Sequence, residues 1–165
     1  MSSTEFDPME LPGAAAWQRS LKPGSSQDAA EPLPGYLTYI KYEVGLDRAI
    51  AVMRLLVPEF VEIRGCVLLR GVESYSTETF EQWWSTLKGD VAAIEDLLNR
   101  LPLWDLFADL TEDGVTDRAL AELGSSIELT WKAALSKRFP NRRFLVEFRD
   151  ETTGYGPTVS FHSLM

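Results

Sequence analysis

Apolar and charged side chains alternate along residues 59–72, which predicts a β-strand with one face in a core. The apolar side chains stand at odd-numbered positions: Val61, Ile63, Val67 and Leu69. The charged side chains stand at even-numbered positions: Glu62, Arg64 and Arg70. Gly65 interrupts this run, either as a bulge or as a hairpin turn at Arg64 and Gly65. Because the apolar positions keep their phase across Gly65, we expect the bulge.

Three further segments alternate in the same way: residues 36–44, 143–149 and 158–162. A helical segment joins residues 36–44 to residues 59–72, and it is long enough for a right-handed parallel crossover. Residues 150–157 connect the last two strands as a hairpin. The four segments therefore predict one mixed, four-stranded sheet.

Apolar residues at steps of three and four predict four helices between these strands. The helices cover residues 47–57, residues 76–100, a short stretch after Pro102, and residues 116–138. We expect Asp47 and Thr116 to cap two of them, and Gly89 to bend the second helix with Asp90 capping its second half. The prediction is an α+β fold in which helices cover one face of the sheet.

Residues 1–35 contain five prolines together with many Gly, Ser and Ala residues, so we expect a flexible arm. Trp17 and Leu21 stand four positions apart in a stretch that can form a short helix. Trp17 either anchors the arm on the body of the protein or docks on another protein. Tethering raises the effective concentration of the arm and favours the first alternative. Residues 36–165 then form a single domain.

The composition suits one folded domain, because 45% of the 165 residues are apolar. Cys66 is the single cysteine, which excludes an intrachain disulfide, and its apolar neighbours predict a buried, unreactive thiol. The first residues lack the basic start and apolar run of a secretory signal, and no run of eighteen apolar residues occurs. We therefore expect a cytoplasmic protein without membrane contact.

The net charge of −9 argues against nucleic-acid binding, because Lys and Arg carry most of the affinity for phosphates. Residues 90–122 hold nine acidic residues and two basic ones. Such a stretch is either a set of solvated helix faces or a surface for a protein with a basic surface, and we expect the second. The predicted partner-binding residues are Trp17 of the arm and six of the acids: Asp90, Asp105, Asp109, Glu112, Asp113 and Asp117.

Residues 109–117 read DLTEDGVTD and resemble the calcium loop of the EF-hand family. Asp109, Thr111, Asp113, Gly114 and Asp117 fill the first, third, fifth, sixth and ninth loop positions. The twelfth position, where the family carries a bidentate Glu, is a leucine in this chain. An acidic corner between two helices, with the glycine ending the first helix, accounts for the same residues without a metal. We expect neither a metal nor a cofactor.

A rival interpretation is a carboxylate-dependent enzyme that uses the polar face of the sheet. That face comprises Tyr39, Lys41, Glu43, Glu62, Arg64, Arg70, Glu147, Arg149 and His162. Glu62 or Glu147 could then act as a base, with Arg64 or Arg149 as an anion clamp. His162 is the single histidine, and no nucleophile elbow accompanies it, so we assign no catalytic residue.

The sequence therefore predicts a non-enzymatic protein-binding module that presents an acidic helical surface to a basic protein. Immunity proteins and adaptors are analogous in size and charge, and this comparison is an analogy only. Two alternatives stay open: the carboxylate-dependent enzyme, and a structural subunit that docks through its N-terminal arm. Neither the partner nor the oligomeric state follows from the sequence.

Overall fold

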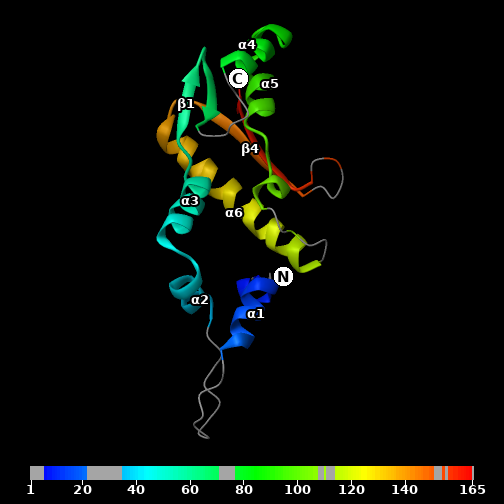
Figure 1. The fold of residues 1–165 in the computed structure, drawn as a ribbon. Helices are drawn as coiled ribbons and strands as arrows, with labels where there is room; N and C mark the ends of the chain where they lie inside the picture. The colour runs from blue at the N-terminus through cyan, green and yellow to red at the C-terminus, as the bar shows by residue number, and fades with distance from the viewer. Residues whose placement is uncertain are drawn as a thin grey trace, which may run out of the picture.

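A computed structural model describes residues 6–21, 35–70, 77–107, 110, 114–150, 154 and 156–164. It confirms the α+β class, with helices on both sides of two small sheets (Figure 1). The helical elements are η1 (Pro8–Glu10), α1 (Pro12–Ser20), α2 (Tyr36–Glu43), α3 (Leu46–Leu56), α4 (Thr77–Thr86), α5 (Val91–Leu98), η2 (Leu103–Leu106) and α6 (Gly114–Arg138). The strands are β1 (Phe60–Ile63), β2 (Cys66–Leu69), β3 (Leu101–Pro102), β4 (Arg143–Arg149) and β5 (Thr158–Leu164).

The strands form two separate antiparallel sheets, so the prediction of one mixed, four-stranded sheet is wrong. One sheet is the β1–β2 hairpin, and the other has the order β3–β5–β4. The hairpin turns at Arg64 and Gly65, whose φ angles of 49° and 86° are both positive, as a two-residue hairpin turn requires. The expected bulge is therefore a turn. Alternation failed to show it because all four residues of β2 are buried, so both of its faces are apolar.

Residues 36–44 form helix α2 rather than a strand, which removes the predicted parallel crossover. Apolar residues occupy most positions of this segment, so its pattern fits a period of two and also the four-residue step from Tyr36 to Ile40. None of the eight residues of α2 is buried. The next helix, α3, begins at Leu46 after Gly45, so Asp47 lies in its first turn instead of capping it.

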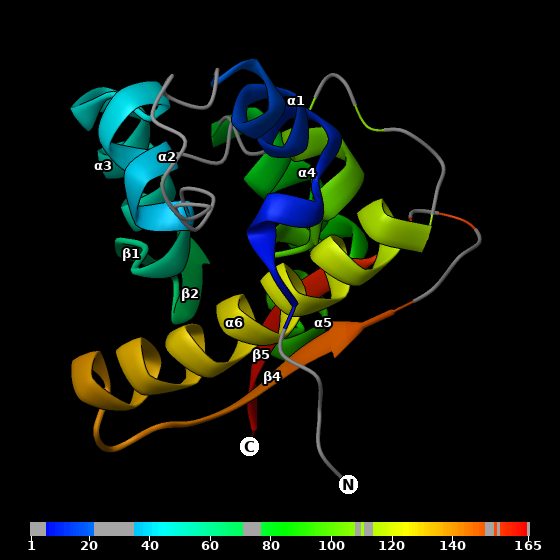
Figure 2. The ribbon, with the colours of Figure 1, turned by 90° about the horizontal axis from the view of Figure 1, so that it is seen from below.

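The larger core lies between α6 and one face of the β3–β5–β4 sheet. Trp131 of α6 packs edge-on against Phe161 of β5, with ring centroids 5.8 Å apart, and both side chains are buried. Val67 and Leu69 of β2 join this core from the hairpin. Figure 2 shows α6 crossing the molecule beside β4 and β5, as the predicted long helix and C-terminal hairpin require.

A smaller core places α4 and α5 against the other side of the hairpin. Its buried side chains are Cys66, Leu68, Phe80, Ile94 and Leu98. The predicted helix 76–100 is divided as expected, since the Asp90 carboxylate accepts a hydrogen bond from the amide of Ala93 and starts α5. Helix α5 also contacts β5 on the face opposite α6. Helices therefore cover both faces of the larger sheet, and the expected single covered face is a further correction.

Candidate functional site

Two fully buried side chains, Glu95 of α5 and its C-cap residue Asn99, bridge the sheets. The Glu95 carboxylate accepts hydrogen bonds from the Val67 amide of β2, at 2.6 Å, and from the backbone amide and hydroxyl of Ser163 on β5. One turn later, the Asn99 side chain accepts from the Leu69 amide at 3.0 Å and donates to the carbonyls of Val67 and Phe161. Each buried backbone group that these side chains contact lacks a strand neighbour on that side, so Glu95 and Asn99 take the place of one.

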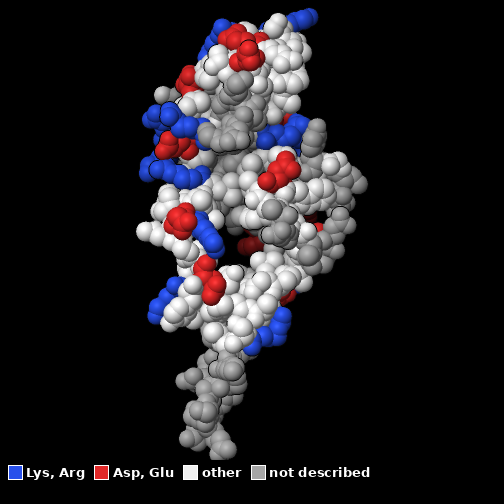
Figure 3. Space-filling view, in the orientation of Figure 1, with Lys and Arg blue, Asp and Glu red and all other residues white. Residues whose placement is uncertain are grey.

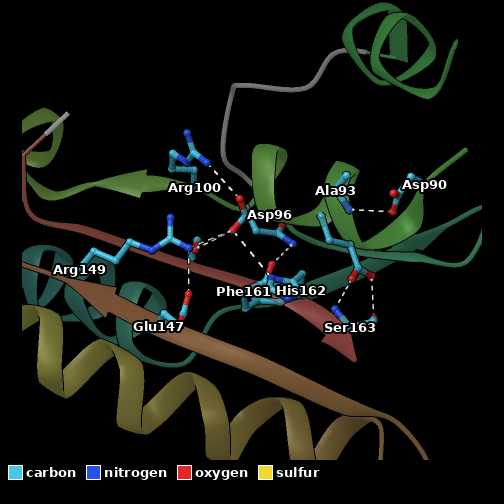
Figure 4. Close-up of polar contacts among 12 residues, drawn as sticks. Asp90, Ala93, Asp96, Arg100, Glu147, Arg149, Phe161, His162 and Ser163 are labelled. Atoms are coloured by element: carbon cyan, nitrogen blue, oxygen red, sulfur yellow. Dashed lines mark hydrogen bonds and ion pairs between the residues drawn. The ribbon is translucent and has the colours of Figure 1, made fainter. Parts of the chain in front are cut away.

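Beside this bridge, Asp96 gathers polar side chains from β4, β5 and the end of α5 (Figure 4). Its carboxylate accepts a hydrogen bond from the Ser160 hydroxyl at 3.1 Å and pairs with Arg100 at 3.0 Å. Nδ1 of His162 lies 3.8 Å and the guanidinium of Arg149 lies 3.9 Å from the same carboxylate. We call these five residues the Asp96 cluster. It is the one place where the structure brings part of the predicted polar face together.

The rest of the predicted polar face is dispersed. Glu62, Arg64 and Arg70 belong to the hairpin, where they pair with Arg142, Glu81 and Glu59. Tyr39, Lys41 and Glu43 lie on α2, away from any strand. Glu147 pairs with Arg149 at 2.9 Å. The predicted enzyme site therefore reduces to the Asp96 cluster and Glu147.

The contacts of the Asp96 cluster are those of a structural junction. The Ser160 side chain is buried, and its hydroxyl proton points at Asp96, so the oxygen is not presented to a substrate as a nucleophile. Arg100 pairs with Asp96 inside the cluster, and Arg149 pairs with Glu147 beside it. Among the described residues, no three His, Cys, Asp or Glu side chains converge in a way that could hold a metal ion.

Cys66 is fully buried in the smaller core, as its apolar neighbours predict. Burial, and to a smaller extent the Glu95 carboxylate, raise the pKa of the Cys66 thiol from 9.0 to about 11, while Arg142 opposes the shift. The thiol is therefore protonated and inaccessible at neutral pH, which makes it a poor nucleophile.

The predicted partner-binding residues lie in different elements. Asp90 is the exposed N-cap of α5, Asp105 is exposed in η2, and Asp117 is exposed in the first turn of α6. Trp17 of α1 packs edge-on against Tyr39 of α2, with ring centroids 5.2 Å apart. Asp109, Glu112 and Asp113 lie outside the described residues, and so does Thr111 of the calcium-loop resemblance.

Helices α2 and α3 carry an exposed apolar surface that the sequence reasoning missed. Nine large apolar side chains on this segment are exposed: Tyr36, Leu37, Ile40, Tyr42, Leu46, Ile50, Val52, Met53 and Val57. We call this set the α2–α3 surface. In Figure 3 the surface over these helices is mostly uncharged, with a few separate basic and acidic side chains. A signal was present, because α3 has more apolar residues than one buried helix face needs.

Beside the contact of Trp17 with Tyr39, an apolar hollow lies between the N-terminal segment, residues 6–21, and helices α2 and α3 (Figure 3). A cavity of about 630 Å³ lies between Pro12, Leu56 and Leu120, and a second of about 610 Å³ reaches Tyr39. Leu11, Phe107 and Leu110 line both cavities. The α2–α3 surface therefore borders a groove and is not a flat extension of the core.

Comparison with known proteins does not add a family to this picture. No protein-family model matches the chain, and neither a curated protein nor a solved structure is significantly similar to it. None of the helices in the described part of the chain combines the length and the apolar character needed to cross a lipid bilayer.

Proposed function

We propose that the chain is a non-enzymatic protein-binding module whose contact area is the α2–α3 surface. The observation that carries this proposal is the exposure of nine large apolar side chains on two consecutive helices. A soluble protein that stays alone rarely leaves so many apolar side chains together in water, because burying each contributes about 1.5–3 kcal/mol. The partner is therefore a protein with a complementary apolar surface.

The state of the polar groups also supports binding over catalysis. In the Asp96 cluster Arg100 pairs with Asp96, Arg149 pairs with the neighbouring Glu147, and the Ser160 hydroxyl is buried and donates to Asp96. A catalytic site needs groups that are accessible and aimed at a substrate. The paired and buried groups of the Asp96 cluster instead suit a structural junction that holds α5 on the sheet.

A second surface of the proposed module is acidic and would attract a basic protein. Asp105 and Asp117 are exposed, and neither carboxylate forms an ion pair within the residues that the structure describes. The chain carries a net charge of −9, so a basic partner approaches in an attractive field. This contact weakens with added salt, whereas an apolar contact does not.

Affinity capture of the tagged full chain from its native cells tests the proposal. We expect Ile50→Glu to reduce capture of a specific protein at least tenfold, because a buried, unpaired charge at an interface costs several kcal/mol. Thr86→Glu adds the same charge on an exposed helix outside the α2–α3 surface, and it should leave capture unchanged. Equal capture by wild type and Ile50→Glu would contradict the proposal.

The acidic surface has its own test. Replacing Asp105 and Asp117 by Asn should lower capture of a basic protein, and the loss should shrink as salt is raised from about 0.05 M to 0.5 M, where charges are screened within a few ångströms. Capture that is insensitive both to salt and to these changes would remove the acidic surface from the proposal.

A further inference from the structure

The exposed apolar residues of α3 follow a spacing that suits a helix partner. Leu46, Ile50 and Met53 are separated by four and three positions, which places them in one stripe along α3, and Val57 follows four positions later as the C-cap. All four are between 41% and 78% exposed. The opposite side of α3 is already occupied, since Leu55 and Leu56 pack on the larger core and the Leu55 carbonyl accepts from Trp131 Nε1 at 2.9 Å. Helix α3 is thus fixed to the body with an apolar stripe facing outward.

We infer that the occupant of this stripe is a second copy of the chain, with the two α3 helices packed antiparallel about a two-fold axis. This inference rests on the proposed function and names its partner. In that arrangement Leu46 lies opposite Val57 of the second copy, and Ile50 lies opposite Met53 of the second copy. The stripe is therefore complementary to itself, as a two-fold interface requires.

The charges beside the stripe also match in this arrangement. Asp47 and Arg54 each follow a stripe residue by one position, so they lie on the same flank of α3. In an antiparallel pair the same flanks of the two helices meet, and Asp47 lies beside Arg54 of the second copy. The two-fold axis repeats this pair. In a single copy Arg54 pairs with Glu59 at 2.9 Å on the surface, and such an exposed contact is weak enough to rearrange or to be shared.

The local charge removes the main obstacle to self-association. Two copies of a chain with a charge of −9 repel each other. Residues 36–57, however, contain three basic residues and two acidic ones, so this segment has a charge of +1. The α2–α3 surface is therefore a part of the molecule where two copies meet with a charge of only +1 on each side.

The experiment is a mass measurement by light scattering on the purified full chain over a range of concentrations. We expect the wild type to approach twice its monomer mass of 18.6 kDa and the Ile50→Glu variant to stay at 18.6 kDa. Val52→Glu is the matched control, because Val52 is exposed on the same helix but stands outside the stripe, and this variant should dimerise. Circular dichroism spectra that match the wild type would establish that each variant is folded.

Charge reversal tests the antiparallel arrangement itself. Asp47→Arg alone and Arg54→Asp alone each bring like charges together in a homodimer, so each should dissociate at least fivefold more readily than wild type. In the first variant both flank positions are arginine, and in the second both are aspartate. A heterodimer of the two therefore pairs opposite charges at both contacts, so an equimolar mixture should regain dimers. The inference is overturned if the Ile50→Glu variant still dimerises, or if the mixture of Asp47→Arg and Arg54→Asp variants stays monomeric.

The outcomes also separate this inference from the proposed function. A wild type that is monomeric at every concentration overturns self-association. If capture from native cells is still lost with Ile50→Glu, the α2–α3 surface binds a different protein and the proposed function stands. If capture is unaffected as well, both are wrong.

Discussion

Glu95 shows how a single side chain can hold two sheets together. Its carboxylate is fully buried and receives the amides of Val67 and Ser163 together with the Ser163 hydroxyl. A carboxylate that receives several donors is strongly held, and removing it leaves those donors unpaired in the core. Its sequence position on an apolar helix gives no hint of this role.

Replacing Glu95 by alanine should lower the free energy of unfolding by about 3–5 kcal/mol, because two backbone amides lose their acceptor and a void remains. Glu95→Gln should cost less, about 1–3 kcal/mol, since its amide NH₂ group opposes one of the backbone donors. Denaturant unfolding measures both changes. Glu78→Ala, at an exposed helix position, is the control and should change stability by under about 0.5 kcal/mol. A Glu95→Ala variant as stable as the control would refute the bridging role.

At the scale of elements, α6 lies close to β4 at Gly124. A Cβ atom at this position would lie 2.2 Å from the ring of Phe148, which is far closer than two carbon atoms can approach. The glycine is therefore needed for the packing of the helix on the strand and not for its backbone conformation.

Gly124→Ala should destabilise the protein by about 1–3 kcal/mol, although alanine is the better helix former by about 1 kcal/mol. The ring of Phe148 must move, and it packs against the larger core. Gly114→Ala in the first turn of the same helix meets no atom within 4 Å, so it should be neutral or slightly stabilising. Thermal unfolding of the two variants compares them directly. Equal stability would show that the helix and strand separate at little cost.

For the whole molecule, the two cores and the N-terminal segment are energetically distinct. The described members of both cores lie between Leu55 and Phe161. Within residues 6–21, Met9 is the one large apolar side chain that is buried, and Glu10 pairs with Arg118 of α6. The N-terminal segment thus rests on a body that is complete without it.

A chain of residues 36–165 should therefore keep a cooperative unfolding transition, with a loss of about 1–3 kcal/mol for the contacts of Met9 and its neighbours. Denaturant unfolding followed by fluorescence and by circular dichroism tests this, because the two signals should coincide. A broad transition, or signals that separate, would show that residues 1–35 belong to the folded domain.

Local spacing determined much of the fold. The sequence predicted α4, α5, α6 and the β4–β5 hairpin, because each of these carries one apolar side at a clear period. It also predicted the cap at Asp90 and the burial of Cys66. These features depend on residues close together in the chain, so the sequence contains the information directly.

Tertiary structure alone decided which apolar surfaces were buried and which polar groups met. The spacing of apolar residues predicts that helix 47–57 covers the sheet, yet the Leu55 side of α3 took the contact with the larger core and left Ile50 and Met53 in water. Glu95 and Asn99 find partners 28 to 68 residues away. Hydrophobic burial has no direction, so periodicity shows that a face is apolar but not what covers it. Only the arrangement of the distant elements supplies that answer.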